Sequence, residues 1–369
     1  MTKKLTGKTH ELQGTAGVPL LWPVAFGTAL LRAGIDLADH NLDFLAEELK
    51  LHGGMEPVLA SNPPVRLALR TMELCDYGPP EANGMPTIVT APYAGHPSSI
   101  ADYDVGQSLM QVLRDGGVGP LYLTNWRSAT PDMKDLEVDQ YLAELLACVD
   151  DLGGRVNLVG LCQGGWTSAM LAARFPDKVA SLVLAGSPID THAGDGPLEQ
   201  MVASTPLSFY EQLVAAGGGR MPGTFMLAGW KSMHPEEHAL EDVQLYEHLD
   251  DPAWLKRKET FERWYENTLD LPGRWYLQVI EHLFRNNEFA RGEFVALGRR
   301  LDPAAIRCPL YLLAGAGDDI TPAPQVFAAA DLFETPTKRV RRETAPGGHI
   351  GLFMGSAALR DTWPRIAAW

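Results

Sequence analysis

Short apolar runs alternate with helical patterns over residues 85–185 and again over residues 309–369. Such runs are typical of buried parallel strands, and the helical patterns are typical of the helices that connect them. The alternation therefore predicts an α/β fold with a mostly parallel sheet and helices on both faces. The expected strands are Met85–Ala91, Pro120–Asn125, Val156–Gly160, Val179–Ala185, Pro309–Ala314 and Lys338–Thr344, and the expected helices are Tyr103–Leu113, Asp139–Leu152, Trp166–Phe175 and Ser356–Trp369.

Two regions lack this alternation. Residues 1–80 contain helical patterns such as Ala38–Leu51 and predict an N-terminal, mostly helical segment. Residues 192–301 contain many helix formers and aromatic side chains but no clear strand, which predicts a helical insertion. The expected organisation is an N-terminal segment (1–80), an α/β core in two pieces (81–191 and 302–369) and a lid or cap insertion (192–301). The aromatic side chains of the insertion either form its own core or line an apolar groove that binds substrate.

Composition narrows the class of function. The chain has 369 residues and a formal net charge of −15 at pH 7, which argues against a general nucleic-acid-binding surface. Its four cysteines have no metal-binding spacing and are typical of free thiols in a reducing compartment. The apolar stretch Ala16–Leu31 is interrupted by prolines and is too short to span a bilayer. We therefore expect a cytoplasmic protein without a metal or other cofactor.

The stretch around Cys162 carries the strongest chemical signal. An apolar run ends in Gly160-Leu-Cys-Gln-Gly, and a helical pattern follows it. This is the nucleophile-elbow pattern of α/β-hydrolases, with cysteine in the place of serine. A nucleophile on a sharp strand-to-helix turn needs small neighbours, which Gly160 and Gly164 provide, and Gly165 allows the helix to pack close to its strand. A buried structural cysteine is the alternative interpretation.

A cysteine nucleophile needs a base, and the base needs a group that orients it. In α/β-hydrolases the acid and then the histidine follow the nucleophile along the chain. Asp318 and Asp319 follow the expected strand Pro309–Ala314, and His349 follows the last expected strand. We therefore expect Cys162, Asp318 and His349 to form a catalytic triad, with Asp319 as the alternative acid.

Two backbone N–H groups are expected to form the oxyanion hole that acyl transfer requires. One belongs to Gln163, which follows the nucleophile, and the other to Tyr93, in the loop after the first expected strand. His96 in the same loop either contacts substrate or makes a structural hydrogen bond. Trp230 and Trp275 are expected to be exposed aromatic residues of the insertion that bind substrate.

With these residues in place, residues 65–369 resemble the superfamily of polyhydroxyalkanoate synthases and intracellular polyhydroxybutyrate depolymerases. The segments that are similar to the synthases are Gly160-Leu-Cys-Gln-Gly-Gly165, Asp318-Asp-Ile-Thr-Pro322 and Pro346-Gly-Gly-His-Ile-Gly351. The segments that are similar to the depolymerases are Ala91-Pro-Tyr-Ala-Gly-His96, Tyr122-Leu-Thr-Asn-Trp126, Gly186-Ser-Pro-Ile-Asp190 and Leu271-Pro-Gly-Arg-Trp-Tyr276. The chain departs from both patterns. Asn125 stands where the synthases commonly carry Asp, and the depolymerases commonly differ from Gly164-Gly165 after Cys-Gln.

The resemblance implies an acyl-enzyme on Cys162 in both branches. The branches differ in whether water or a hydroxyl-ended polymer accepts the acyl group. Because the depolymerase-like segments are spread over more of the chain, we expect a depolymerase-like thiol esterase that hydrolyses polyester or hydroxyalkanoate oligomers, in the cytoplasm or at a storage granule. The alternatives are a polyhydroxyalkanoate synthase that uses hydroxyacyl-CoA and a non-catalytic granule-binding protein.

Overall fold

The computed structural model of the protein describes residues 58–78, 83–233 and 244–369. The chain divides into two compact units, one made of residues 1–53 and 239–259 and the other of residues 54–238 and 260–369. In the described part of the first unit, the buried Leu245 packs against apolar side chains, namely Tyr246, Leu249, Trp254 and Leu255. The second unit contains the main sheet and all the candidate site residues.

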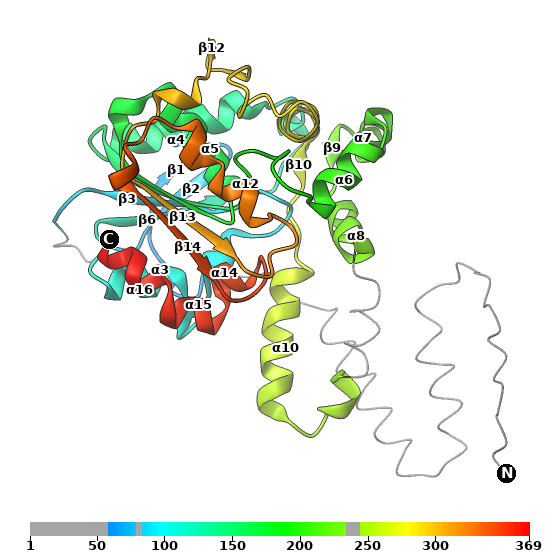
Figure 1. Ribbon diagram of the computed structural model, residues 1–369. Coiled ribbons are helices and arrows are strands. Elements are labelled where there is room, and N and C mark those ends of the chain that lie inside the picture. Colours follow the sequence, from blue (N-terminus) through cyan, green and yellow to red (C-terminus); the bar gives the residue numbers. More distant parts are fainter. Residues whose placement is uncertain (1–57, 79–82, 234–243) are drawn as a thin grey trace, which may run out of the picture. The chain divides into compact units, whose positions relative to one another are not determined.

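An eight-stranded sheet forms the centre of the second unit (Figure 1). Across the sheet the strands follow the order β1 (Val65–Ala68), β2 (Met72–Asp76), β6 (Leu121–Trp126), β3 (Thr87–Thr90), β7 (Val156–Leu161), β8 (Val179–Ala185), β13 (Leu310–Gly315) and β14 (Val340–Ala345). Neighbouring strands from β6 to β14 are parallel, whereas β2 is antiparallel to both β1 and β6. The predicted mostly parallel α/β fold is confirmed, and all six expected strands are present.

Helices cover both faces of the sheet, because its central strands are apolar on both sides. Every residue of β3 and of β13 is buried. Helices α4 (Val138–Asp151) and α5 (Gln163–Arg174) lie on one face, and α3 (Leu109–Asp115) and α16 (Trp363–Ala368) lie on the other (Figure 1). The other elements of the core are η3 (Ser98–Ala101), β4 (Asp102–Asp104), β5 (Gln107–Ser108), η4 (Pro131–Met133), η5 (Pro176–Lys178), η7 (Pro303–Ala305), α12 (Ala323–Phe327), α13 (Ala329–Leu332), η8 (Thr337–Arg339), α14 (Gly351–Met354) and α15 (Ser356–Asp361).

The described part of the predicted N-terminal helical segment is not helical. Residues 58–78 contain β1 and β2, which extend the main sheet at one edge, so the sheet begins before residue 81. The two strands form a hairpin in which Leu67 lies opposite Leu74. Their burial fits this position, because β1 is mostly exposed at the edge and β2 is mostly buried. The predicted helix Ala38–Leu51 lies outside the described residues.

Two expected helices have different bounds in the structure. Helix α3 begins at Leu109 and not at Tyr103, because Gly106 adopts a positive φ of 78° between the short strands β4 and β5. Ser108 then caps α3 by accepting a hydrogen bond from the Gln111 N–H. The expected C-terminal helix is divided into α15 and α16, since Thr362 separates them.

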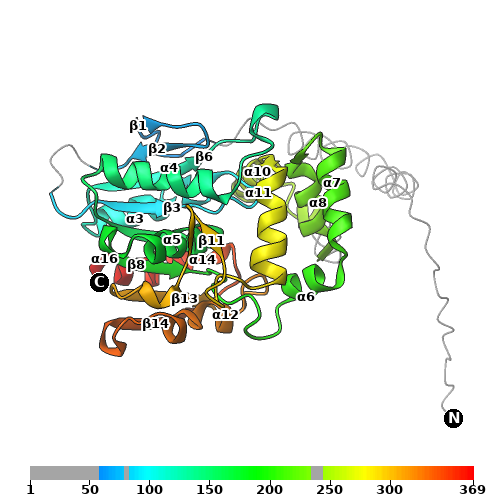
Figure 2. The ribbon, with the colours of Figure 1, turned by 90° about the horizontal axis from the view of Figure 1, so that it is seen from above.

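The insertion is mainly helical where the structure describes it. Its elements are α6 (Pro197–Ser204), α7 (Leu207–Ala216), β9 (Arg220–Met221), α8 (Gly223–Met233), α10 (Pro252–Tyr265), β10 (Leu271–Pro272), α11 (Gly273–Gln278), the π-helix η6 (Val279–Arg285), β11 (Val295–Ala296) and β12 (Arg299–Arg300). The sequence analysis missed the two short strand pairs, β9 with β10 and β11 with β12. Figure 2 shows α6, α7, α8 and α11 gathered at one end of the sheet.

Candidate active site

Cys162 lies on a sharp turn between β7 and α5. The strand ends at Leu161, and the helix begins at Gln163. The backbone of Cys162 has φ 49° and ψ −120°, an unfavourable conformation for a residue with a side chain, and such strain is concentrated at functional sites. The turn is held in place because the Cys162 N–H donates a 2.9 Å hydrogen bond to the carbonyl oxygen of Ala185 in β8.

The three glycines around Cys162 are required by close backbone contacts. A Cβ atom on Gly160 would lie 2.3 Å from the Cα of Gly165, and one on Gly164 would lie 2.0 Å from the carbonyl oxygen of Thr90. A Cβ atom on Gly165 would lie 1.8 Å from Oγ of Ser187. The steric roles that the sequence analysis assigned to these glycines are therefore confirmed: α5 packs so closely on the sheet that none of them can carry a side chain.

His349 and Asp318 meet at the carboxyl edge of the same sheet. Asp318 follows β13, and its Oδ2 lies 2.8 Å from Nδ1 of His349, which follows β14. The other carboxylate oxygen of Asp318 accepts hydrogen bonds from the backbone N–H groups of Ile320 and Thr321. These bonds fix the carboxylate, and the neighbouring Asp319 has an exposed side chain. The structure thus places the Asp318 carboxylate against the imidazole of His349.

A side-chain hydrogen bond also joins the imidazole of His349 to the sulfur of Cys162. Because Asp318 occupies Nδ1, Nε2 is the ring nitrogen left for this contact. All three residues are buried, with Cys162 and His349 each 8% exposed and Asp318 7% exposed. The geometry therefore brings together the three residues that the sequence analysis selected.

Electrostatics favour a protonated His349. Burial by itself disfavours the imidazolium, but the negative charge of the Cys162 sulfur and the hydrogen bonds to Asp318 and Cys162 outweigh it. The net result raises the pKa of His349 above its ordinary value. An imidazolium next to a cysteine sulfur is the form in which the sulfur is ready to attack a carbonyl carbon.

The two expected oxyanion donors lie at neighbouring strand ends. Gln163 is the first residue of α5, and Tyr93 lies in the loop after β3, which pairs with β7. Within the described part of the chain, neither backbone N–H donates a hydrogen bond. The side chain of Tyr93 is buried, and its hydroxyl lies 3.2 Å from the carbonyl oxygens of Arg127 and Asp270. The side chain thus anchors the loop, while the role of its N–H stays a prediction.

His96 makes the structural hydrogen bond that was one of its two expected roles. Its Nε2 lies 3.1 Å from the carbonyl oxygen of Tyr265, and its ring stacks on the rings of Trp264 and Tyr265. Burial lowers the pKa of His96 to about 4, although the hydrogen bond opposes this effect. The imidazole, packed against these two neighbouring aromatic rings, joins the Tyr93 loop to the insertion.

The expectation that Trp275 is exposed is wrong, and its role in binding substrate stays a prediction. Its side chain is 2% exposed and packs against Tyr93, Tyr141 and Trp166, with ring centroids 5.1 to 6.1 Å apart. The physical reason is that α11 packs its apolar face on the loop after β3 and on α5. Trp230 is half-buried, and its indole N–H has no partner in the described parts of the chain.

Three further residues around the site, Trp166, Thr191 and Asn287, were not among the expected ones. Trp166 follows Cys162 by four residues, so its spacing alone places it one helical turn from the nucleophile. Asn287 and Thr191 are joined by a hydrogen bond between side chains, although 96 residues separate them. No local pattern in the sequence signals such a long-range pair.

Neither a metal-binding cluster nor a membrane-spanning helix occurs in the described residues. Among residues 58–78, 83–233 and 244–369, no group of three or more His, Cys, Asp or Glu side chains is arranged to hold a metal ion. In the same ranges, no helix is both long and apolar enough to cross a membrane.

The strand order, the elbow after β7 and the Asp and His loops after β13 and β14 define an α/β-hydrolase fold. The structure of a monoacylglycerol lipase from Paleococcus ferrophilus shares this fold, with a TM-score of 0.50 and 14% identity over 81% of this chain and 98% of that chain. Residues 56–358 match the family described as "Protein of unknown function (DUF3141)", and the chain belongs to this family.

Two curated relatives confirm the expected resemblance to polyhydroxyalkanoate synthases. Over 301 residues the chain is 29% identical to the poly(3-hydroxyalkanoate) polymerase subunit PhaC of Allochromatium vinosum. This match covers 79% of this chain and 82% of the relative. Over 277 residues it is 27% identical to the protein of the same name from Haloferax mediterranei. That match covers 73% of this chain but only 55% of the relative.

Proposed function

We propose that this protein catalyses acyl transfer from hydroxyalkanoate esters or thioesters through an acyl-enzyme on Cys162. The observation that carries the proposal is the buried contact of His349 with both Cys162 and Asp318. A nucleophile, a base and an orienting carboxylate are the groups that nucleophilic acyl transfer requires. The similarity to polymerase subunits supports hydroxyalkanoate units as the acyl group.

The reaction takes place in two halves. The sulfur of Cys162, whose proton is held by His349, attacks the ester carbonyl carbon and forms a tetrahedral oxyanion. The N–H groups of Gln163 and Tyr93 stabilise this oxyanion. When the intermediate collapses, the bond to the leaving oxygen or sulfur breaks, the leaving group takes the proton from His349, and a thioester on Cys162 remains. Asp318 keeps the ring oriented and stabilises its positive charge.

With water as the acceptor, the second half is hydrolysis. His349 removes a proton from water, the hydroxide attacks the acyl carbon, and Cys162 leaves with a proton from His349. The depolymerase-like segments support this acceptor, because they are spread over more of the chain than the synthase-like ones. The proposed function is thus that of a polyester or oligoester hydrolase, acting at the surface of a storage granule or on soluble oligomers.

With a hydroxyl-ended chain as the acceptor, the second half is polymer elongation. The relatives named as polymerase subunits favour this second candidate. His349 then removes the proton of the terminal hydroxyl, and one ester bond forms for each thioester that breaks. The same nucleophile, base and acid serve both outcomes, so the product distinguishes them.

A thiol-reaction experiment separates an enzyme from a non-catalytic granule-binding protein. Burial raises the pKa of Cys75 and Cys148 to about 12 and that of Cys308 to about 11, so these three thiols are protonated and slow to react at neutral pH. Iodoacetamide should therefore modify one cysteine rapidly, and peptide mass spectrometry should identify it as Cys162. An unreactive Cys162 would favour the granule-binding protein.

Product analysis tests the reaction itself. The protein is incubated separately with amorphous polyhydroxybutyrate and with 3-hydroxybutyryl-CoA. Released hydroxybutyrate or oligomers identify the hydrolase, and free CoA together with new polymer identifies the synthase. A protein that yields neither product, while Cys162 is intact and the fold is native, contradicts the proposal.

A further inference from the structure

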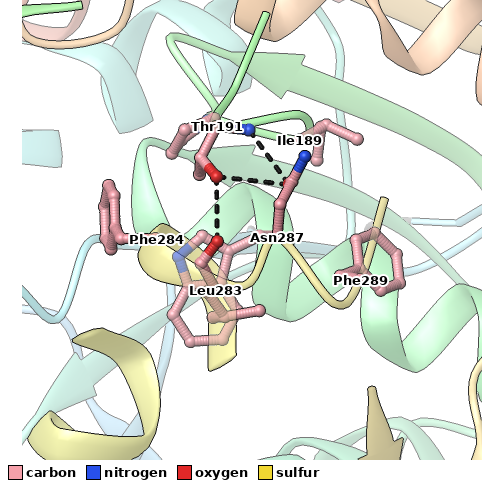
Figure 3. A pocket seen from close by; sticks show the side chains of 8 residues that line it. Ile189, Thr191, Leu283, Phe284, Asn287 and Phe289 are labelled. Atoms are coloured by element: carbon pink, nitrogen blue, oxygen red, sulfur yellow. Dashed lines mark hydrogen bonds between the residues drawn. The ribbon is translucent and has the colours of Figure 1, made fainter. Parts of the chain in front are cut away.

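Hydrogen bonds join the insertion to the core at several places, and two of these contacts involve residues without an expected catalytic role. In the first, the Thr191 hydroxyl lies 2.8 Å from the carbonyl oxygen of Leu283 and 3.2 Å from Oδ1 of Asn287 (Figure 3). In the second, the Leu297 N–H donates a 2.8 Å hydrogen bond to the carboxylate of Asp139 in α4. Both contacts attach the insertion to the core away from the loop after β3.

A third contact reaches that loop, which carries Tyr93. Four hydrogen bonds join residues 93–97 to residues 264–270 of the insertion, and the two segments run in opposite directions. The pairs are Tyr93 with Asp270 (3.2 Å), Gly95 with Leu269 (2.7 Å), His96 with Tyr265 (3.1 Å) and Pro97 with Trp264 (3.2 Å). An insertion segment therefore lies along the loop that holds an expected oxyanion donor.

The Tyr93 loop is closely packed between the core and the insertion. Gly95 has a positive φ of 91°, and a Cβ atom on it would lie 3.3 Å from Sδ of Met226 in α8. The Tyr93 side chain is 3% exposed, and its hydroxyl also lies 3.2 Å from the Arg127 carbonyl oxygen and accepts a 3.0 Å hydrogen bond from Tyr141. Because both the side chain and the backbone of the loop are held, the direction of the Tyr93 N–H is set by these neighbours.

Asp270 holds the end of this insertion segment in place. Its carboxylate accepts hydrogen bonds from the Arg220 guanidinium at 2.7 Å and from the Gly223 N–H at 3.0 Å. Its backbone N–H donates to Oγ of Ser128 at 2.9 Å, and its carbonyl oxygen accepts from the Ala129 N–H at 2.8 Å. One residue thus connects β9 and α8 of the insertion with the loops after β6 and β3.

We propose that Asp270 is a positioning residue for acyl transfer, which holds the Tyr93 N–H where the oxyanion forms. This inference rests on the proposed function. The bonds of the carboxylate to Arg220 and Gly223 fix the carbonyl oxygen of the same residue. That oxygen in turn holds the Tyr93 hydroxyl. A displacement of about 1 Å in an active site can lower a rate by about a hundredfold, so the insertion segment matters for the chemistry itself.

The test compares two reactions of Cys162 that differ in their need for an oxyanion hole. Acylation by p-nitrophenyl 3-hydroxybutyrate passes through a tetrahedral oxyanion, whereas iodoacetamide forms a carbon–sulfur bond and releases iodide without one. Asp270→Asn removes the charge and one acceptor oxygen. We expect its rate of acylation, measured as nitrophenol release in the first turnover, to fall by about 10- to 100-fold, while alkylation stays within about twofold. A general disturbance of the triad would lower both rates.

The matched control is Asp139→Asn, because Asp139 is also a carboxylate that binds a backbone N–H across the contact of insertion and core. Its ratio of acylation to alkylation should stay within about twofold of the wild-type ratio, since it does not touch the Tyr93 loop. Tyr93→Phe is a second variant, which removes the hydroxyl that Asp270 holds and should also lower the ratio. It carries the test if Asp270→Asn does not fold.

The outcomes separate this inference from the proposed function. An unchanged ratio in the folded variant, or an equal fall in Asp139→Asn, overturns the positioning role of Asp270 and leaves the proposed function standing. If wild-type Cys162 is alkylated but not acylated, the proposed function fails, and this inference fails with it.

Discussion

The loops that hold Cys162, Asp318 and His349 and the insertion helices α8 and α11 are built differently. The loops are fixed by backbone contacts, such as the Cys162 N–H to Ala185 and the close approach of Gly164 to Thr90. The insertion also makes backbone hydrogen bonds to the core, such as that from the Leu269 N–H to the Gly95 carbonyl. It adds a cluster of aromatic side chains, in which Trp275 packs against Tyr93 and Trp166. The catalytic loops thus depend on close backbone contacts, and the insertion depends on aromatic packing as well.

The largest expected effect is on the backbone-fixed region. Cys162→Ala should reduce turnover by at least about a thousandfold, because no other group can form the acyl-enzyme. Circular dichroism and thermal unfolding should remain close to those of the wild-type protein. Activity at the wild-type level in a folded Cys162→Ala variant would remove this cysteine from the mechanism.

The orienting acid should matter less than the nucleophile. Asp318→Asn is expected to lower kcat by about 100- to 10,000-fold, because His349 loses the carboxylate that orients it and stabilises its charge. Asp319→Asn serves as the matched control, and its effect should be within a few fold because its side chain is exposed. If the two variants exchange these results, Asp319 is the acid.

A substitution in the aromatic cluster of the insertion should mainly lower the stability of the protein. Trp275→Ala removes a buried aromatic side chain and should lower the free energy of unfolding by about 3–5 kcal/mol. Per folded molecule, its activity on polymer and on a short ester should fall together. Urea unfolding measures the first effect, and rates normalised to active protein measure the second. A loss confined to polymer would instead mean that Trp275 contacts the substrate chain.

A pair of glycines sharpens the comparison. Gly165→Ala places a Cβ atom 1.8 Å from Ser187 Oγ and should destabilise the protein by about 1–3 kcal/mol or prevent folding. Gly229 lies in α8 of the insertion. A Cβ atom on it would have no atom of the described residues within 4 Å, apart from its chain neighbours and the nearby backbone of its own helix. Gly229→Ala should therefore stabilise the helix by about 0.5–1 kcal/mol. Equal effects at both positions in thermal unfolding would contradict the distinction between the two regions.

The smallest expected effect concerns Trp230. Its half-buried position still fits the prediction that it contacts a polymer chain. Trp230→Ala should weaken action on polyhydroxybutyrate by a few fold more than action on a soluble ester, since only the long substrate extends beyond the nucleophile. An equal loss on both substrates would assign Trp230 to the packing of α8.

The same difference explains what the sequence could predict. The apolar runs identified all six expected strands, and the glycine spacing around Cys162 identified the elbow, because backbone constraints leave local signatures. The helical prediction failed for residues 65–76, where β1 depends on pairing with β2, and β2 depends on pairing with β6. Trp275 was misplaced because its burial results from contacts with residues more than 100 positions away. The pairing of Thr191 with Asn287 has the same long-range origin.

The adjacency of β8 and β13 has a consequence for how the protein could diversify. The two strands are parallel neighbours, so the stretch between them leaves the sheet at the carboxyl end of β8 and returns to it at the amino end of the adjacent β13. Closing a loop becomes only slowly more difficult as the loop grows, by about 0.6 kcal/mol for each doubling of its length. Residues can therefore be added to or removed from this stretch with little change in the stability of the sheet. Relatives could therefore differ widely in which substrates reach the cysteine, while the strands and loops that hold the catalytic residues stay the same.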